Sequence, residues 1–210
     1  MNWIFQCNHV LSVIISGLDI MINKKFVQQL KKDYAKNGSE RRQIISLSNI
    51  VLHDSKRVIF SLHRGDIKKA EESLREIEKI LTDLDKKFGH CRLADEGSYK
   101  AGVEEYIEAK MFYLVSTEQK VDKLKNMNMD VDSYLGGICD LTGEMVRKAV
   151  NQAAAGNMKE VEKMKEGINE IMAELVEFDM TGYLRTKYDQ AKNNLRKMEQ
   201  VAYEIKIRNK

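Results

Sequence analysis

Residues 67–88 read IKKAEESLREIEKILTDLDKKF, and their apolar side chains recur at alternating steps of three and four residues. This spacing is typical of an amphipathic helix that buries one side. Three other segments have the same pattern, one of them interrupted by Ser55. The four rows are Ile67, Ala70, Leu74, Ile77, Leu81, Leu84 and Phe88; Val161, Met164, Ile168, Ile171, Leu175 and Phe178; Leu184, Tyr188, Ala191, Leu195, Met198, Ala202 and Ile205; and Ile44, Leu47, Val51, Val58 and Leu62.

We interpret each row as the core-facing side of a helix, with packing between subunits as the alternative for the last one. Asn37-Gly38-Ser39 predicts a turn, Gly65 a helix end and Asp66 an N-cap. No segment alternates as a strand would. The predicted fold is all-α, a single antiparallel bundle of about seven helices. We expect these helices near residues 22–36, 40–64, 66–88, 97–121, 133–155, 157–178 and 182–208.

The composition agrees with long helices and limits the function only weakly. The 210 residues include no proline, and 32% of them are charged. The net charge of +3 is below that of a strongly basic nucleic-acid module. The three cysteines, Cys7, Cys91 and Cys139, form no CxxC pair, which argues against a disulfide framework or a zinc site. A reducing compartment, the cytoplasm, is therefore expected.

The first 20 residues differ from the remainder. The apolar run from Val10 to Leu18 is shorter than the roughly 20 residues that span a bilayer. No basic residue precedes Lys24, whereas a secretory signal begins with a basic region. We expect residues 1–20 to be an extension outside the core, residues 21–210 to be the helical domain, and no membrane partner. A short packed helix or an interfacial anchor is the alternative for the extension.

Four acidic residues are candidates for chemistry. Helical spacing places Glu105 and Glu108 on one face of a helix, and Asp140 and Glu144 on one face of another. Glu104 is expected to face solvent. Partly buried carboxylates repel one another, so they must be protonated, paired with cations or bound to a metal ion. Mg²⁺ prefers such oxygen ligands, whereas ordinary solvated faces or salt bridges are the alternative.

Four segments, in matching order, resemble segments of the translin family. They are residues 47–64, LSNIVLHDSKRVIFSLHR; residues 105–109, EYIEA, followed by Phe112; residues 134–144, YLGGICDLTGE; and the final helix, from Lys187-Tyr188-Asp189 to Val201-Ala202-Tyr203-Glu204-Ile205-Lys206-Ile207-Arg208. The family has a nucleic-acid-binding branch, translin proper, and a ribonuclease branch, translin-associated factor X. Asp140 is similar to the ribonuclease branch, because the translin branch has an apolar residue there.

The resemblance implies a Mg²⁺-dependent endoribonuclease, with Mn²⁺ as a substitute ion. It also implies that Glu105, Glu108, Asp140 and Glu144 are the metal ligands and catalytic acids. The implied substrate is single-stranded RNA, or single-stranded DNA, inside a homo-oligomer, expected to be an octamer. Phosphates need cations near the metal, so we expect RNA contacts from basic residues of the first long helix. The candidates are Lys56, Arg57 and Arg64.

Two rival functions remain open. One is a non-catalytic nucleic-acid-binding protein like translin, against which Asp140 argues. The other is an all-helical nucleoside triphosphate pyrophosphohydrolase, whose EExxE signature is normally followed by ExxD rather than the DxxxE of this chain. A ribonuclease that uses histidines is not expected, because His53, His63 and His90 form no pair at helical spacing.

Overall fold

The computed structural model describes residues 22–124 and 129–208, so the predicted extension, residues 1–20, lies outside the described residues. The chain divides into two compact units, Met1–Arg42 and Gln43–Lys210. Residues 22–42 are the described part of the first unit. The second unit contains most of the helices and all the residues of the candidate site.

The described residues form seven helices and no strand, which confirms the all-α prediction. Three of the four apolar rows and both acidic segments fall within single helices. None of the helices in residues 22–124 and 129–208 combines the length and the apolar character needed to cross a membrane. The helices are α2 (Lys24–His63), α3 (Ile67–Phe88), α4 (His90–Ala94), α5 (Gly97–Ser116), α6 (Val131–Ala154), α7 (Met158–Leu175) and α8 (Gly182–Arg208).

Several helix ends are set by local hydrogen bonds. Gly65, with φ 77°, lies in the turn between α2 and α3. The Asp66 side chain caps α3 by accepting a hydrogen bond of 3.2 Å from the Lys69 backbone N–H. Asp130 caps α6 in the same way, accepting from Ser133 N–H at 2.8 Å. The predicted stop and N-cap at residues 65 and 66 are therefore confirmed.

Several boundary predictions were wrong, and one short helix was not predicted. The turn at Asn37-Gly38-Ser39 does not form, because α2 continues through it. One glycine costs a helix only about 1 kcal/mol, and no proline interrupts the segment. α5 ends at Ser116 instead of residue 121, since Thr117 Oγ1 donates to Tyr113 O at 2.8 Å. The five-residue α4 has no periodic pattern long enough to predict it.

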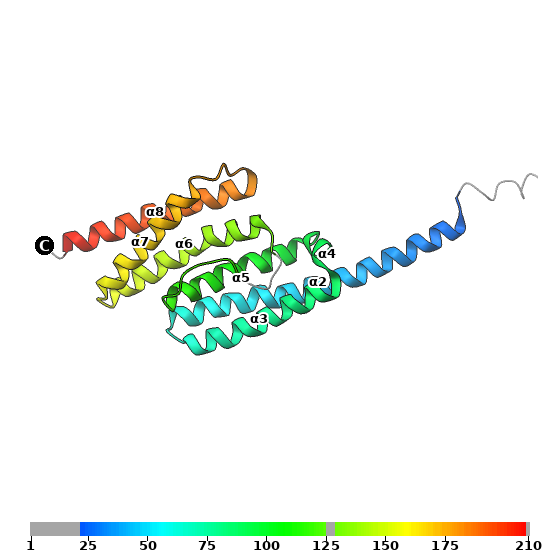
Figure 1. Ribbon diagram of the computed structural model, residues 1–210, viewed down its shortest axis with the longest axis horizontal. Coiled ribbons are helices and arrows are strands. Elements are labelled where there is room, and N and C mark those ends of the chain that lie inside the picture. The colour runs from blue at the N-terminus through cyan, green and yellow to red at the C-terminus, as the bar shows by residue number, and fades with distance from the viewer. Residues whose placement is uncertain (1–21, 125–128, 209–210) are drawn as a thin grey trace, which may run out of the picture. The chain divides into compact units, whose positions relative to one another are not determined.

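The second unit packs around α5 and α6. α6 contacts α5, α7 and α8, while α3 contacts α5. α2 approaches α5 closely at Gly102, where an added Cβ would lie 2.9 Å from Ser48 O. In Figure 1, α5 lies between α2 and α6, and these two neighbours of α5 run in the same direction as α5. α3 and α7 run in the opposite direction, as expected for helices joined by short turns.

The apolar rows form the core, with some changes. The five central members of the 67–88 row are buried, and so is Ser55, at the gap in the 44–62 row. In α7, Met172 is buried while Phe178, predicted to be a core residue, is half exposed. The reason is that α7 ends at Leu175, so the helical spacing no longer applies to Phe178.

Candidate functional site

Glu108 is at the centre of an acidic cluster formed by α5 and α6. Its side chain is 9% exposed and has no hydrogen bond or ion pair to another side chain in the described part of the chain. Burial, together with the charges of Glu105, Asp140 and Glu144, raises the pKa of Glu108 to about 9. The structure thus brings together the four acids that the sequence predicted, which we call the acidic cluster.

The two helices can approach because α6 has glycines where it faces α5. An added Cβ at Gly137 would lie 2.6 Å from Ile107 Cγ2 and 3.1 Å from Glu104 O. α5 and α6 run in the same direction (Figure 1), and the charges of Glu105, Asp140 and Glu144 all act on Glu108. The glycine pair 136–137 therefore lets the acidic faces of α5 and α6 come together.

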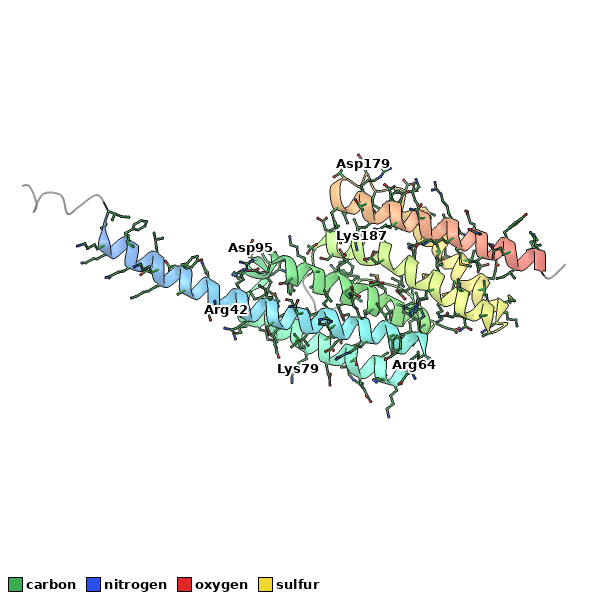
Figure 2. All side chains as sticks on the ribbon, turned by 180° about the vertical axis from the view of Figure 1, so that it is seen from behind. Arg42, Arg64, Lys79, Asp95, Asp179 and Lys187 are labelled. Atoms are coloured by element: carbon green, nitrogen blue, oxygen red, sulfur yellow. The ribbon has the colours of Figure 1, made fainter. Side chains whose placement is uncertain are left out.

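Lys187 enters the cluster from α8 (Figure 2). Its Nζ lies 2.8 Å from Glu104 Oε1 and is also paired with the Asp140 carboxylate. Tyr183 Oη, one turn earlier, donates a hydrogen bond of 2.6 Å to Glu104 Oε1. Burial opposes the charged form of Lys187, but the hydrogen bonds to Asp140, Glu104 and Tyr183 outweigh it and raise the Lys187 pKa.

The predicted exposure of Glu104 is wrong. Its side chain is 14% exposed and belongs to the network with Lys187. The carboxylate lies over α6 at Gly136, where an added Cβ would be 2.2 Å from Glu104 Oε2. The spacing of four residues places Glu104 on the same side of α5 as Glu108. Spacing alone does not reveal that α6 and α8 cover this side, which is why the predicted exposure failed.

His63 lies at the other end of the cluster. Its Nε2 is 2.5 Å from Glu144 Oε2, its side chain is 5% exposed, and its ring lies 4.9 Å from that of Phe112. Arg147 is 3.5 Å from the same Glu144 oxygen. Burial would raise the Glu144 pKa, but the hydrogen bonds and charges of His63 and Arg147 lower it overall. His63 orients Glu144 and was not recognised from the sequence.

Of the three predicted RNA-binding residues, Lys56 and Arg57 lie exposed on α2, and Arg64 is exposed directly after its end. Lys56 Nζ is 3.9 Å from Glu105 Oε2, which joins this surface to the acidic cluster. Arg57 pairs with Asp54 at 2.8 Å, and Arg64 lies 5.6 Å from the centre of the Phe60 ring. A groove of about 650 Å³ between α2 and α3 is lined by His53, Asp54, Lys56, Arg57, Phe60, Ser61, Lys69, Ser73 and Glu76.

The cluster has suitable donors for a hard divalent ion, because all four acids offer carboxylate oxygens. An uncompensated buried acid, Glu108, also favours a cation at this place. Within residues 22–124 and 129–208, however, no three His, Cys, Asp or Glu side chains are already grouped as metal ligands. Asp140 Oδ2 is paired with Lys187 and Glu144 Oε2 with His63, so an ion at these residues would share the carboxylates with these partners or displace them.

Comparison with known proteins identifies the family. The translin family model matches residues 39–209. The chain belongs to the translin family. An uncharacterized protein of Methanocaldococcus jannaschii is 27% identical over 171 residues, which cover 78% of this chain and 75% of the relative. The translin-associated protein X homolog of Schizosaccharomyces pombe is 24% identical over 201 residues, covering 86% and 84% of the two chains.

Solved structures confirm the translin-like fold. Apo-NeC3PO matches with a TM-score of 0.76 and 25% identity, over 89% of this chain and 99% of the other. AfC3PO in complex with duplex RNA matches with the same TM-score and 20% identity, over 86% and 96%. The predicted family and fold class are thereby confirmed for this translin-family chain.

Proposed function

We propose that this protein is a Mg²⁺-dependent endoribonuclease that hydrolyses single-stranded RNA within a homo-oligomer, with Mn²⁺ as a substitute ion. The observation that carries the proposal is Glu108, a buried carboxylate beside three other acids and without a cationic partner in the described structure. Membership of the translin family supports nucleic acid as the substrate class and favours this function over nucleotide triphosphate hydrolysis. Similarity to a translin-associated protein X homolog supports the ribonuclease branch.

Glu105, Glu108, Asp140 and Glu144 would hold the ion. A bound Mg²⁺ activates water and stabilises negative charge on the phosphate. His63 fixes the orientation of Glu144 through its contact with Oε2. Lys56 connects Glu105 to the surface of α2, so a phosphate bound near Lys56 would lie close to the cluster. One of the glutamates would act as general base.

The groove between α2 and α3 is our proposed path for the RNA strand. Lys56, Arg57 and Lys69 supply cations for phosphates, and the half-exposed Phe60 ring offers a stacking surface for a base. Single-stranded DNA has the same phosphates and bases and is a second possible ligand. AfC3PO, as a fold neighbour, is known in complex with duplex RNA, so a duplex belongs in the binding comparison.

The test measures cleavage of a labelled single-stranded RNA with Mg²⁺, with Mn²⁺ and with chelator. Cleavage should require either ion, and Glu108→Gln should reduce the rate at least about a hundredfold, because a carboxylate ligand is lost at nearly constant volume. Glu118→Gln is the matched control, since Glu118 is an exposed glutamate outside the cluster. Nucleotide triphosphates and duplex RNA serve as alternative substrates.

The product ends distinguish the mechanisms. Water attack leaves one terminal phosphate per cut, expected on the 5′ side, and no 2′,3′-cyclic phosphate. It should also tolerate replacement of the 2′-hydroxyl next to the scissile bond, unless that hydroxyl is needed for recognition. Cyclic ends together with cleavage in chelator would overturn the metal mechanism and leave the family assignment intact.

A non-catalytic single-stranded nucleic-acid-binding protein is the second candidate. The observation that favours it is the pairing of Asp140 with Lys187 and of Glu144 with His63, which occupies two expected ligands. In that case RNA binding would persist in chelator, and no ion would produce cleavage. Binding measured by fluorescence anisotropy, alongside the cleavage assay, separates the two functions.

A further inference from the structure

Lys187 and Glu104 are not used by the proposed cleavage reaction. Lys187 nevertheless places a positive charge inside the acidic cluster from a third helix, with its side chain 17% exposed. Its two acidic partners differ in kind, because Asp140 is an expected metal ligand and Glu104 is not. A shift of the Lys187 ammonium from Asp140 to Glu104 would therefore free a carboxylate that is an expected metal ligand.

Lys187 and a divalent ion would compete for Asp140. The ammonium of Lys187 is in direct contact with the Asp140 carboxylate. A divalent ion bound to that carboxylate would lie close to the ammonium, and two cations at such a separation repel strongly where water is largely excluded. Repulsion between the two cations therefore favours departure of the ammonium from Asp140 when the ion binds there.

Glu104 is built to keep the ammonium nearby. Tyr183 Oη donates to Glu104 Oε1 at 2.6 Å and fixes the carboxylate. Gly136 leaves the space that Glu104 Oε2 occupies, since a Cβ there would come within 2.2 Å of it. Lys187 Nζ is already 2.8 Å from Glu104 Oε1, so it can lose Asp140 and keep an anionic partner.

We propose that Lys187 is an internal cation that competes with the divalent ion for Asp140, and that Glu104 holds Lys187 when the ion binds. Both are positioning residues, because they act on the ligand Asp140. The inference rests on the metal site of the proposed function, but it does not depend on RNA cleavage. It explains why the acids are close together without forming a ready set of metal ligands.

The experiment titrates MnCl₂ into the full chain by calorimetry, without RNA. Lys187→Met should bind Mn²⁺ about tenfold more tightly than the wild type, because the competing cation is gone. Glu104→Gln should bind it more weakly, because Lys187 then has Asp140 as its only carboxylate partner. Lys187→Arg should remain near the wild type. Lys163→Met, which removes an exposed lysine paired with Glu118, is the control for loss of charge alone.

The double variant with Glu104→Gln and Lys187→Met tests whether Glu104 acts only by holding Lys187 or is itself a metal ligand. If Glu104 acts only through Lys187, then Glu104→Gln has no effect on Mn²⁺ affinity in the Lys187→Met background. If the weakening persists there, Glu104 is itself a ligand and the inference is wrong. Glu104→Gln and Lys187→Met must therefore change the Mn²⁺ affinity in opposite directions. Their effects must not add in the double variant.

Thermal unfolding supplies a second readout. In chelator, Lys187→Met should melt at a lower temperature, because Asp140 and Glu104 have lost their cation. Added MnCl₂ should raise its melting temperature more than that of the wild type. Lys187→Gln provides the same comparison if the methionine variant does not fold. Equal or weaker Mn²⁺ binding by Lys187→Met and Lys187→Gln than by the wild type, or no binding by any form, overturns the inference. The cleavage assay reports separately on the ribonuclease.

Discussion

Glu108 links the chemistry of the site to the stability of the protein. Its pKa of about 9 in the folded chain lies above the ordinary value of 4.5, because burial and three acidic neighbours oppose ionisation. A carboxyl group with a raised pKa contributes stability that is complete below its unfolded pKa and is lost as the pH rises through the folded pKa. Without a divalent ion, the protein should therefore become less stable between pH 4.5 and 9.

Glu108→Gln should remove this pH dependence. In chelator near pH 9, the variant should be more stable than the wild type by about 1 kcal/mol or more, since a neutral amide replaces a group that is costly to ionise. Urea unfolding at several pH values, at one protein concentration, measures the effect. Glu118→Gln, at an exposed site, should retain the wild-type slope. A wild-type slope in Glu108→Gln would show that other groups cause the pH dependence.

At the residue scale, the sequence predicted the acids but not their partners. Glu105, Glu108, Asp140 and Glu144 have helical spacing and a family resemblance, both of which are local features. The partners of these acids are distant in sequence: Lys187 pairs with Asp140, and His63 with Glu144. No periodicity reports such contacts, because they depend on which faces of α2, α6 and α8 meet.

At the element scale, the approach of α5 to α6 determines whether the acids meet. Gly137→Ala would place a Cβ 2.6 Å from Ile107 Cγ2 and 3.1 Å from the backbone of Glu104. Overpacking of this kind costs about 1–3 kcal/mol, and it should also weaken Mn²⁺ binding by separating the two acidic faces. Unfolding by urea and Mn²⁺ titration measure the two effects.

Gly97→Ala is the matched control for that substitution. Gly97 is the first residue of α5, and an added Cβ there meets nothing within 4 Å. This variant should be at least as stable as the wild type, because alanine favours the helix over glycine. If Gly137→Ala were equally well tolerated, the glycine would not be needed for the approach of α5 to α6.

The elements themselves were largely predictable from periodicity, and their exceptions have local causes. Five central residues of the 67–88 row are buried, because α3 is one regular helix with caps at both ends. The turn expected at Gly38 failed because a lone glycine weakens a helix without ending it. The direction of α6 along α5 was not predictable, since helical spacing is the same for parallel and antiparallel neighbours.

At the scale of the whole molecule, apolar residues remain exposed in each unit when it is considered by itself. In the second unit, Val176 and Ile207 are exposed, whereas Val201 packs against the core. In the first unit, apolar residues recur every four positions, at Ile22 just before α2 and at Phe26, Leu30 and Tyr34 on α2, and all four are exposed. Such a stripe on a helix is typical of a surface covered by another protein chain.

We therefore expect the chain to assemble, with the α2 stripe contributing to contacts between subunits. Light scattering at micromolar concentration should give a mass several times 24.3 kDa for the wild type. Phe26→Glu with Leu30→Glu should lower this mass towards that of one chain, because burying two carboxylates in an apolar contact is costly. Lys32→Glu changes charge on another side of the same helix and should leave the mass unchanged. A monomeric wild type would remove the homo-oligomer from the proposed function, whereas an oligomer that tolerates the double substitution would place the contacts on other surfaces, such as those of Val176 and Ile207.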